Sequence, residues 1–248
     1  MSQDVRPVAS YGKASSRPHS ILQYIIDEGL LGEDGEPVKL PPLDRLASEL
    51  GVSRGKLREE LIAAEAYGMI DMRPGDGTYI RPFDFYAATR PLVLYAIASD
   101  RRNFDHFYRL RAQLEVAFWD DAVRALGSAE HDRLERILRR AERKLKDTPV
   151  EIPHEEHRIF HVLIFSRLDN SFAQGLLKAY WDAYEAVGLH RYFDYSYYER
   201  MWASHRAMVQ AILDKRYEEG KQTLVEHFTL LADRLQEEKE REGPGGLR

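Results

Sequence analysis

Four of the nine histidines in this chain are spaced so that they could hold a metal ion. His157 and His161 stand four residues apart in a stretch of helical character, which places both side chains on one helix face. Imidazole is the commonest protein ligand for zinc and related divalent ions, and two histidines at this spacing can chelate one ion. His205 and His227, on two later helical stretches, would complete a site of three or four ligands inside a helical bundle. Taken singly, each histidine is more typical of a structural role, so only the His157 and His161 spacing favours a ligand.

The same histidines permit an enzymatic interpretation, a metal-dependent hydrolase or lyase. His154-Glu155-Glu156 suggests the start of the zinc-protease motif, but the residue four positions after His154 is Arg158, so that motif is absent. No carboxylate stands at motif spacing to act as a general base, although Glu155, Glu156 and Glu226 lie nearby in the sequence. The residues alone therefore leave an enzyme and a binding protein open.

A second set of charged residues, near the N-terminus, has the spacing of a DNA-contacting surface. Ser53 can cap a helix whose first turns carry Arg54, Lys56 and Arg58. Arg54 and Arg58 lie on one face of that helix, about 40° apart. A helix with exposed cations at its start is suited to enter a DNA groove and touch phosphates and guanine edges.

Three further residues extend this surface. Arg45 begins the preceding helix, where it can reach the DNA backbone, while Arg73 and the glycine turn at Gly75 could enter the adjacent minor groove. The alternative is a solvated charged face in which Arg58 pairs with Glu59 or Glu60. The order of helix, turn, helix and wing favours DNA binding over that alternative.

The elements that must position these two sets differ in kind. Residues 17–82 show three helical stretches followed by a strand, a tight turn at Pro74-Gly75-Asp76-Gly77 and a second strand, which predicts a winged helix-turn-helix. Residues 83–240 show helical patterns only and predict an all-α bundle. The predicted helices of this bundle span roughly 86–98, 104–126, 128–146, 154–167, 170–193, 197–213 and 217–239. The fold class is thus mainly α, with a disordered arm over residues 1–16 and a flexible tail over 241–248.

Composition narrows the classes of protein. The chain lacks cysteine, so disulfides, thiol nucleophiles and thiolate metal sites are excluded. Its formal charge of −5 argues against indiscriminate coating of nucleic acid, and residues 17–82 also hold more acidic than basic residues. No apolar run approaches the ~20 residues of a membrane span, and the N-terminus does not resemble a signal peptide. We expect a cytoplasmic protein whose DNA contacts come from a local cluster.

The segment from Leu40-Pro41 to Leu61 resembles the GntR family of bacterial transcription regulators, and the wing over residues 73–80 continues the resemblance. It implies DNA contacts at Arg45, Arg54, Arg58 and Gly75. Two departures are visible: Pro42-Leu43-Asp44 stands where Ser or Ala and then Glu are usual, and residues 63–66 lack the usual leucine of the third helix. Neither departure changes the arginines.

The helical part resembles the FCD effector domain of FadR-type GntR regulators. The resemblance rests on Arg111-Ala112-Gln113-Leu114-Glu115, His157-Arg158-Ile159-Phe160-His161, Ser204-His205 and Glu226-His227. It implies a divalent metal held by one aspartate and three histidines, with the aspartate position falling on His157 and the histidines on His161, His205 and His227. Four neutral nitrogens favour Zn²⁺ or Ni²⁺ over Mn²⁺ or Mg²⁺. Alternatively, His157 does not ligate, which leaves three histidines and open positions.

Arg111 matches the family's early arginine, which faces the effector cavity. A guanidinium fork fits a carboxylate, so beside a metal it would help bind a small organic acid; the alternative is a salt bridge with Glu115. Many aromatic residues follow and predict core and cavity wall, with a pocket for a bulkier ligand as the other interpretation. They are Tyr180, Trp181, Tyr184, Tyr192, Phe193, Tyr195, Tyr197, Tyr198 and Trp202.

Together these features predict a ligand-responsive transcription regulator, a repressor rather than an enzyme. We expect a homodimer that places two third helices in successive major grooves of a palindromic operator, and a small anionic effector that changes their separation. The alternatives are the metal-dependent hydrolase or lyase and a constitutive DNA-binding protein with a purely structural metal.

Overall fold

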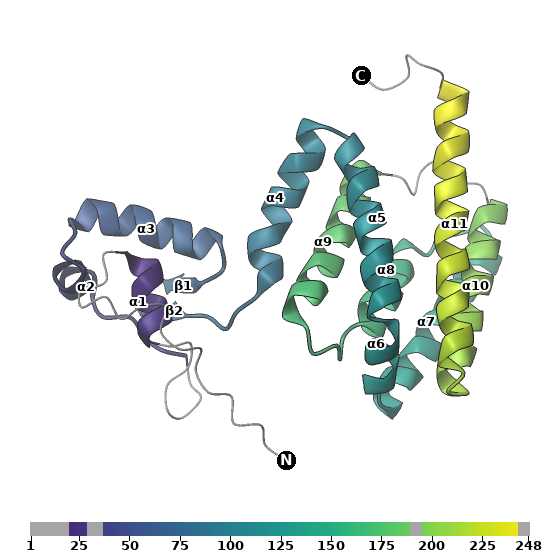
Figure 1. Cartoon of the computed structure of the whole chain (residues 1–248), viewed down its shortest axis with the longest axis horizontal. Coiled ribbons are helices and arrows are strands. Elements are labelled where there is room, and N and C mark those ends of the chain that lie inside the picture. Colours follow the sequence, from purple (N-terminus) through teal and green to yellow (C-terminus); the bar gives the residue numbers. More distant parts are fainter. Residues whose placement is uncertain (1–19, 29–36, 189–194, 243–248) are drawn as a thin grey trace. The chain divides into compact units, whose positions relative to one another are not determined.

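The computed structural model describes residues 20–28, 37–188 and 195–242, with side chains described as far as residue 230 (Figure 1). The chain forms two compact units, Met1–Ala88 and Thr89–Arg248, and the described part is mainly helical with one small sheet. The predicted fold class is confirmed. In the sequence, the boundary between the units falls after Ala88, six residues beyond the predicted boundary after residue 82. The predicted arm over residues 1–16 and residues 243–248 of the predicted tail lie outside the described residues.

The first unit contains three helices and a hairpin. The helices are α1 (Ile21–Glu28), α2 (Leu43–Leu50) and α3 (Arg54–Ala66), and the strands are β1 (Ile70–Arg73) and β2 (Gly77–Ile80). The strands pair antiparallel, with Arg73 opposite Gly77 at the turn. The segment before α2 lies along the other edge of β2, since the Leu40 amide donates to the Thr78 carbonyl at 2.8 Å. This arrangement is a winged helix-turn-helix.

Local chemistry explains the turn between α2 and α3. Gly51 has a φ of +69°, in the left-handed region that favours glycine, and its amide donates to the Ala47 carbonyl. Ser53 then caps α3, with its Oγ accepting from the Lys56 amide at 3.2 Å. Leu57 and Leu61 bury one face of α3 in a small core, which fixes the opposite face toward solvent. The cations of α3 are therefore held on the exposed side.

The second unit is a bundle of helices. Its elements are α4 (Phe85–Ser99, which begins in the first unit), α5 (Arg102–Ala117), α6 (Trp119–Ala125), α7 (Ser128–Lys146), α8 (His154–Ile164), α9 (Ser171–Val187), α10 (Tyr195–Leu213) and α11 (Tyr217–Glu242). Helices α5, α10 and α11 run roughly alongside one another in Figure 1, and α11 packs against both of the others. Trp119, Trp181 and Trp202 are fully buried in the core of this unit.

Two predicted helices differ from the observed ones. The predicted helix over 104–126 is two helices, because the chain turns at Phe118, whose φ of −96° and ψ of 7° leave the helical range. The predicted helix over 170–193 ends earlier, at Val187, where Gly188 adopts a φ of +67°. Residues 189–194 lie outside the described residues.

The first turns of α11 pack tightly against the bundle. Trp119 Nε1 donates to the Tyr217 carbonyl at 2.8 Å, and α11 also packs against α6 and α10. A Cβ added to Gly220 would lie 2.7 Å from Trp119 Cζ2 and 3.3 Å from the Ala211 Cβ. These separations are too short for a side chain, so glycine is required by close helix packing at this position.

Candidate metal centre and DNA-contacting residues

The four predicted histidines meet inside the bundle. His157 and His161 project from α8, His205 from α10 and His227 from α11. One ring nitrogen from each residue can be chosen so that all four nitrogens lie within 4.8 Å of one another. Nitrogens bound tetrahedrally to one ion at ~2.0–2.1 Å stand ~3.4 Å apart, so closing the site needs each ring to shift by less than ~1 Å. The helix packing thus assembles the donor set that the sequence predicted.

The centre is buried, and most of its ring nitrogens have no partner among the described residues. The four histidines are between 0% and 6% exposed. Within the described part of the chain, five of their ring nitrogens have neither solvent contact nor a hydrogen-bond partner; they are His157 Nε2, His161 Nε2, His205 Nδ1, His205 Nε2 and His227 Nδ1. A buried polar atom without a partner costs ~1–3 kcal/mol. Convergent nitrogens of this kind fit a divalent metal, which would satisfy several of them at once.

The imidazoles are held in the neutral form that binds metals. Burial lowers the pKa of each of the four histidines well below its usual range. The neighbouring imidazoles and the Arg111 guanidinium lower the pKa of His157 and His205 further. Protonation of several adjacent rings in this interior would be costly, so the site is poised for a metal and disfavours protons.

A buried carboxylate connects this centre to Arg111. The Arg111 Nε donates to Glu115 Oε1 at 2.6 Å, and Glu115 Oε2 lies 2.9 Å from His161 Nδ1. The salt bridge that the sequence offered as an alternative for Arg111 is therefore present. One donor of the same guanidinium, the Nη2 atom, is buried and has no partner among the described residues. Burial raises the pKa of the Glu115 carboxyl, and the Arg111 charge opposes that shift.

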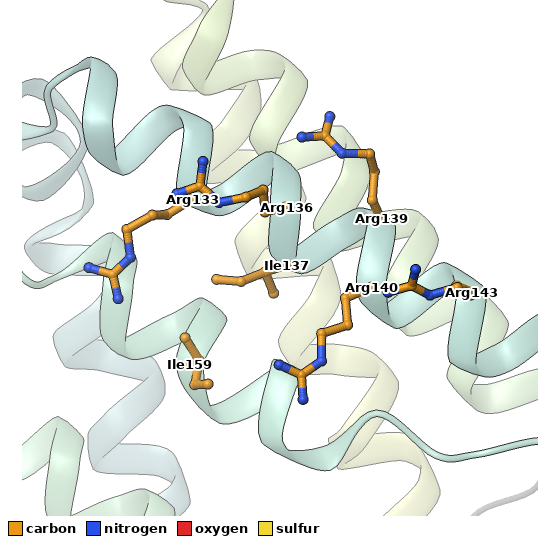
Figure 2. A pocket seen from close by; sticks show the side chains of 7 residues that line it. All are labelled: Arg133, Arg136, Ile137, Arg139, Arg140, Arg143 and Ile159. Atoms are coloured by element: carbon orange, nitrogen blue, oxygen red, sulfur yellow. The ribbon is translucent and has the colours of Figure 1, made fainter.

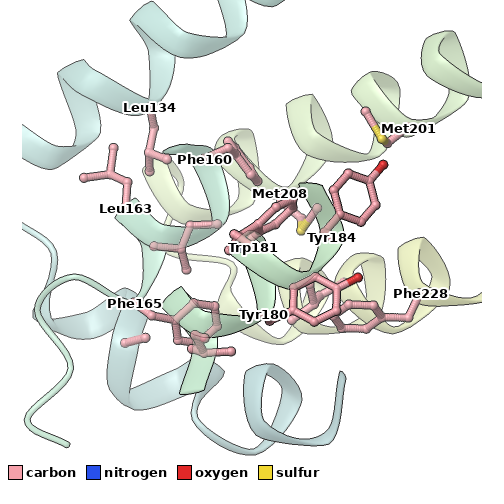
Figure 3. Packing of buried hydrophobic residues seen from close by; sticks show 14 of the residues in the cluster. Leu134, Phe160, Leu163, Phe165, Tyr180, Trp181, Tyr184, Met201, Met208 and Phe228 are labelled. Carbon is pink, nitrogen blue, oxygen red and sulfur yellow. The ribbon is translucent and has the colours of Figure 1, made fainter. Parts of the chain in front are cut away.

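Aromatic rings enclose the histidines and the arginine. The Trp181 ring lies 4.7 Å from the His157 ring between centroids, and the Phe160 ring lies 4.4 Å from that of His205. The Arg111 guanidinium lies over Tyr180 at 4.4 Å, and Figure 3 shows Tyr180, Trp181 and Phe228 in the core packing. These rings form core and site wall together. Of the predicted aromatic set, Tyr192 and Phe193 lie outside the described residues.

Two carboxylates near the centre have roles that sequence reasoning missed. Glu115 was considered only as a partner of Arg111, yet it also contacts His161, 46 positions away. Glu156, beside His157, is 1% exposed and pairs with Arg140 of α7, with Arg140 Nε 2.6 Å from Glu156 Oε1. Neither contact has a local signal in the sequence, because each joins two helices that only the tertiary fold brings together.

The predicted DNA-contacting cations are exposed, and most of them are paired within their own unit. Arg45 pairs with Glu49, Arg54 with Asp44, Lys56 with Glu60, and Arg73 with Asp71 and Asp76. Arg58 is exposed and has no ion pair within the described residues. The predicted alternative, pairing of Arg58 with Glu59 or Glu60, is not observed; Glu60 instead accepts from the Ile21 amide at 2.9 Å.

The wing presents a glycine tip. Gly75 has a φ of +79°, and a Cβ built on it would meet no described atom within 4 Å, so the tip is open. Beside it, the Arg73 guanidinium lies 4.4 Å from the centre of the Tyr79 ring, whose hydroxyl donates to Asp76 Oδ1 at 3.1 Å. Lys39 also pairs with Asp76 and was not predicted as part of this surface.

A winged helix-turn-helix joined to an all-helical unit defines a class of DNA-binding transcription regulators. The model of bacterial regulatory proteins of the gntR family matches residues 30–80, and the FCD domain model matches residues 106–230, just over half of the chain. The chain belongs to the GntR family of transcription regulators, in the group with a C-terminal FCD domain. This family consists of regulators and not enzymes, so the hydrolase or lyase alternative is not supported.

The relatives of the chain that are described by name are transcriptional regulators. It is 24% identical to the Uxu operon transcriptional regulator of Escherichia coli over 90% of this chain and 89% of that protein. It is 29% identical to the regulator LutR of Bacillus subtilis over 41% of this chain, and 39% identical to Mce2R of Mycobacterium tuberculosis over 46% of this chain. Those two matches span 46% of LutR and 55% of Mce2R, about half of each.

Solved structures show the same fold. A GntR protein of Streptococcus agalactiae superimposes with a TM-score of 0.59 at 19% identity, covering 79% of this chain and 88% of that one. E. coli McbR/YncC gives a TM-score of 0.50 at 17% identity, covering 82% and 88%. Among the described residues, no helix combines the length and the apolar character that crossing a membrane requires.

Proposed function

We propose that this chain is a metal-containing, ligand-responsive repressor that binds a palindromic operator as a homodimer. The observation that carries the proposal is the group of five buried imidazole nitrogens that have no partner among the described residues, beside a buried guanidinium donor that likewise has none there. A structural core would not leave so many buried polar atoms unsatisfied. A metal together with an anionic effector would satisfy both kinds of atom.

His157, His161, His205 and His227 would hold the metal, and a bound divalent ion would supply positive charge to anchor an anionic ligand. Four neutral nitrogens without a carboxylate favour Zn²⁺ or Ni²⁺ over Mn²⁺ or Mg²⁺. Glu115 supports this assignment, because a carboxylate that accepts from His161 Nδ1 leaves Nε2 as the ligand atom. Arg111 and Glu115 carry opposite charges, so the metal would leave the centre net positive.

The effector that fits this centre is a small organic acid. The Nη2 donor of Arg111 has no partner in the part of the chain that the structure describes, and an arginine donor beside a cation is a typical carboxylate site. Tyr180 and Trp181, which lie against the guanidinium, limit the space for a larger ligand. We infer that the effector alters the spacing of the two recognition helices of a dimer, so that both half-sites of the operator are no longer contacted together.

DNA release by a panel of small carboxylates tests this function. The operator is first selected from a random pool of duplexes, and its Kd is measured by fluorescence anisotropy at fixed salt. At least one carboxylate should weaken binding by about 5- to 150-fold, the usual range of allosteric coupling. The same carboxylate should have no effect on the His161→Ala variant. If no small carboxylate changes the Kd of metal-loaded protein, the sensing function is wrong.

One alternative has structural support, a constitutive DNA-binding protein with a purely structural metal. The near-complete burial of all four histidines favours it, since a buried metal can serve stability alone. Metal removal by a chelator separates the two functions. A structural metal predicts a large fall in the melting temperature and a carboxylate panel without effect, whereas a sensing metal predicts that the carboxylate response disappears with the metal.

A further inference from the structure

A groove lined by arginines lies between α7 and α8, and its residues belong to neither site above. It has a volume of about 550 Å³. Figure 2 shows the lining residues, which are Arg133, Arg136, Ile137, Arg139, Arg140, Arg143 and Ile159. The volume is within the range of ~300–1,000 Å³ that small-molecule sites occupy.

The sequence of α7 concentrates these cations on one face. Arg133, Arg136, Arg140 and Arg143 follow the spacing i, i+3, i+7 and i+10, which makes a stripe about 15 Å long. The opposite face of α7, with Leu134 among its buried residues, packs into the bundle. The helix carries seven basic and four acidic residues in a chain whose formal charge is −5. The groove is therefore a region of local positive charge on a protein whose formal net charge is negative.

Three of the five arginines that line the groove have no ion pair among the described residues. Arg139 pairs with Glu135, and Arg140 pairs with Glu155 and Glu156. Within the described residues, Arg133, Arg136 and Arg143 make no ion pair and no side-chain hydrogen bond, and all three are exposed. Like charges held this close repel one another, and an anion with several charges would relieve that repulsion.

We propose that this groove binds a small anion carrying two or more phosphate groups, of the nucleoside di- or triphosphate class. Planar guanidinium forks match phosphate oxygens, and three free arginines spread along the stripe match several phosphates better than one carboxylate. Ile137 and Ile159 offer apolar contact for the rest of the ligand, which a bare inorganic chain lacks. The hollow shape favours a small molecule over a duplex or an acidic protein surface.

Isothermal titration of the full chain with adenosine triphosphate, inorganic triphosphate and adenosine tests the proposal. The Arg136→Gln, Arg143→Gln double variant leaves all four histidines in place, so it separates the groove from phosphate binding at the metal centre. The matched control is Arg109→Gln with Lys178→Gln, which removes the same charge from exposed positions elsewhere in the second unit. All proteins also carry Arg54→Ala and Arg58→Ala, which suppresses anion binding by the DNA-contacting surface.

The groove variant should bind adenosine triphosphate at least about tenfold more weakly, because each lost charge-assisted hydrogen bond costs about tenfold or more. The control should stay within about twofold of its parent. Adenosine triphosphate tighter than inorganic triphosphate assigns the site to nucleotides, equal binding assigns it to the polyphosphate alone, and adenosine should not bind. Two results overturn the proposal: equal weakening in the control, or no binding of either triphosphate at millimolar concentration.

A non-operator duplex and polyglutamate serve as competitors in the same titrations. If either binds more tightly than adenosine triphosphate, and only the groove variant loses that binding, the groove is a docking surface for a macromolecule and the proposal is wrong. Circular dichroism of both double variants shows whether a loss of binding comes from misfolding.

Discussion

The two candidate sites of this protein handle their charges in opposite ways. In the DNA-contacting unit, four of the five cations of α2, α3 and β1 are exposed and paired with carboxylates of the same unit. In the metal centre, four neutral imidazoles are buried and five of their nitrogens have no partner among the described residues. The cations of the first site already have carboxylate partners, which DNA would have to replace. The second site is preassembled, and within the described part of the chain it leaves buried ring nitrogens without partners.

This difference teaches how each site should respond to its surroundings. Exposed ion pairs are worth little and are weakened by salt, so DNA can replace the carboxylates at small cost. Buried nitrogens respond to protons and metals, and their response is insensitive to salt. The sensing half should therefore depend on pH and metal, and the DNA-contacting half on ionic strength. The following experiments test this contrast.

The largest expected effect is the loss of stability of metal-free protein in mild acid. Burial lowers the folded-state pKa of the four histidines, so below the unfolded value near ~6.5 the unfolded chain binds protons that the folded chain does not. Their contribution is present above this pH and is lost as pH falls through it. From pH ~7.5 to ~5.5 each histidine should lower the free energy of unfolding by about 1.4 kcal/mol, which sums to about 5.5 kcal/mol at most for four.

Urea unfolding of chelator-treated protein at the two pH values measures this loss. The raised pKa of Glu115 acts in the opposite direction and reduces the total. The variant His205→Phe should show a loss smaller by about 1.4 kcal/mol, which separates the site from other titrating groups. An unfolding free energy that is the same at both pH values would contradict the neutral, buried state of these rings.

The next largest effect concerns the recognition helix. Replacing Arg54 and Arg58 together with Ala should weaken operator binding by about 4 kcal/mol, or about a thousandfold, since each contact contributes ~1–3 kcal/mol. Anisotropy titrations with the selected operator measure the change. Arg102→Ala removes another exposed, ion-paired arginine, in the second unit, and should leave the Kd unchanged. Intact binding by the double variant would show that α3 is not the recognition helix.

A smaller effect, on metal affinity, is expected when the hydrogen-bond partner of His161 is removed. Glu115→Gln keeps the shape of the side chain but replaces the carboxylate that faces His161 Nδ1, and loss of such a partner typically lowers metal affinity 10- to 100-fold. Competition with a colorimetric zinc chelator measures the affinity. Glu218→Gln, at an exposed position of α11, is the matched control for the loss of one carboxylate charge. An unchanged zinc affinity would mean that Glu115 does not orient His161.

The smallest effect concerns the internal ion pairs of the DNA-contacting unit. Asp44→Asn releases Arg54 and removes a negative charge beside the DNA, so affinity for non-operator duplex should rise a few-fold at low salt. The gain should vanish at high salt. Asp169→Asn, an exposed carboxylate of the second unit, should have no effect. A gain that persists at high salt would indicate a structural change in place of an electrostatic one.

The sequence predicted the fold well because its apolar spacing follows the helices closely. The break at Phe118 was missed because the buried positions continue across it; Glu115 before the break and Trp119, Ala122 and Val123 after it keep a helical spacing. A turn that preserves the spacing of buried residues leaves no trace in the periodicity.

The candidate site was predictable only in part. The pairing of His157 with His161 follows from their spacing, but the convergence of His205 and His227 depends on how α10 and α11 pack against α8. The same limit explains why the contact of Glu115 with His161 and the pairing of Arg54 with Asp44 were not predicted. Contacts between separate helices arise from the tertiary fold, and the local sequence pattern does not predict them.

The geometry of the histidine centre depends on Gly220, which lies on α11 outside the centre. Gly220 and His227 are seven positions apart on α11 and so lie on the same face, about 10 Å apart along the helix. With no side chain at Gly220, α11 can approach Trp119 closely enough to bring His227 within reach of the other three histidines. The separation of the two helix axes thus sets the position of the His227 ring two turns away, and a single methyl group at Gly220 would move that ring away from the other three.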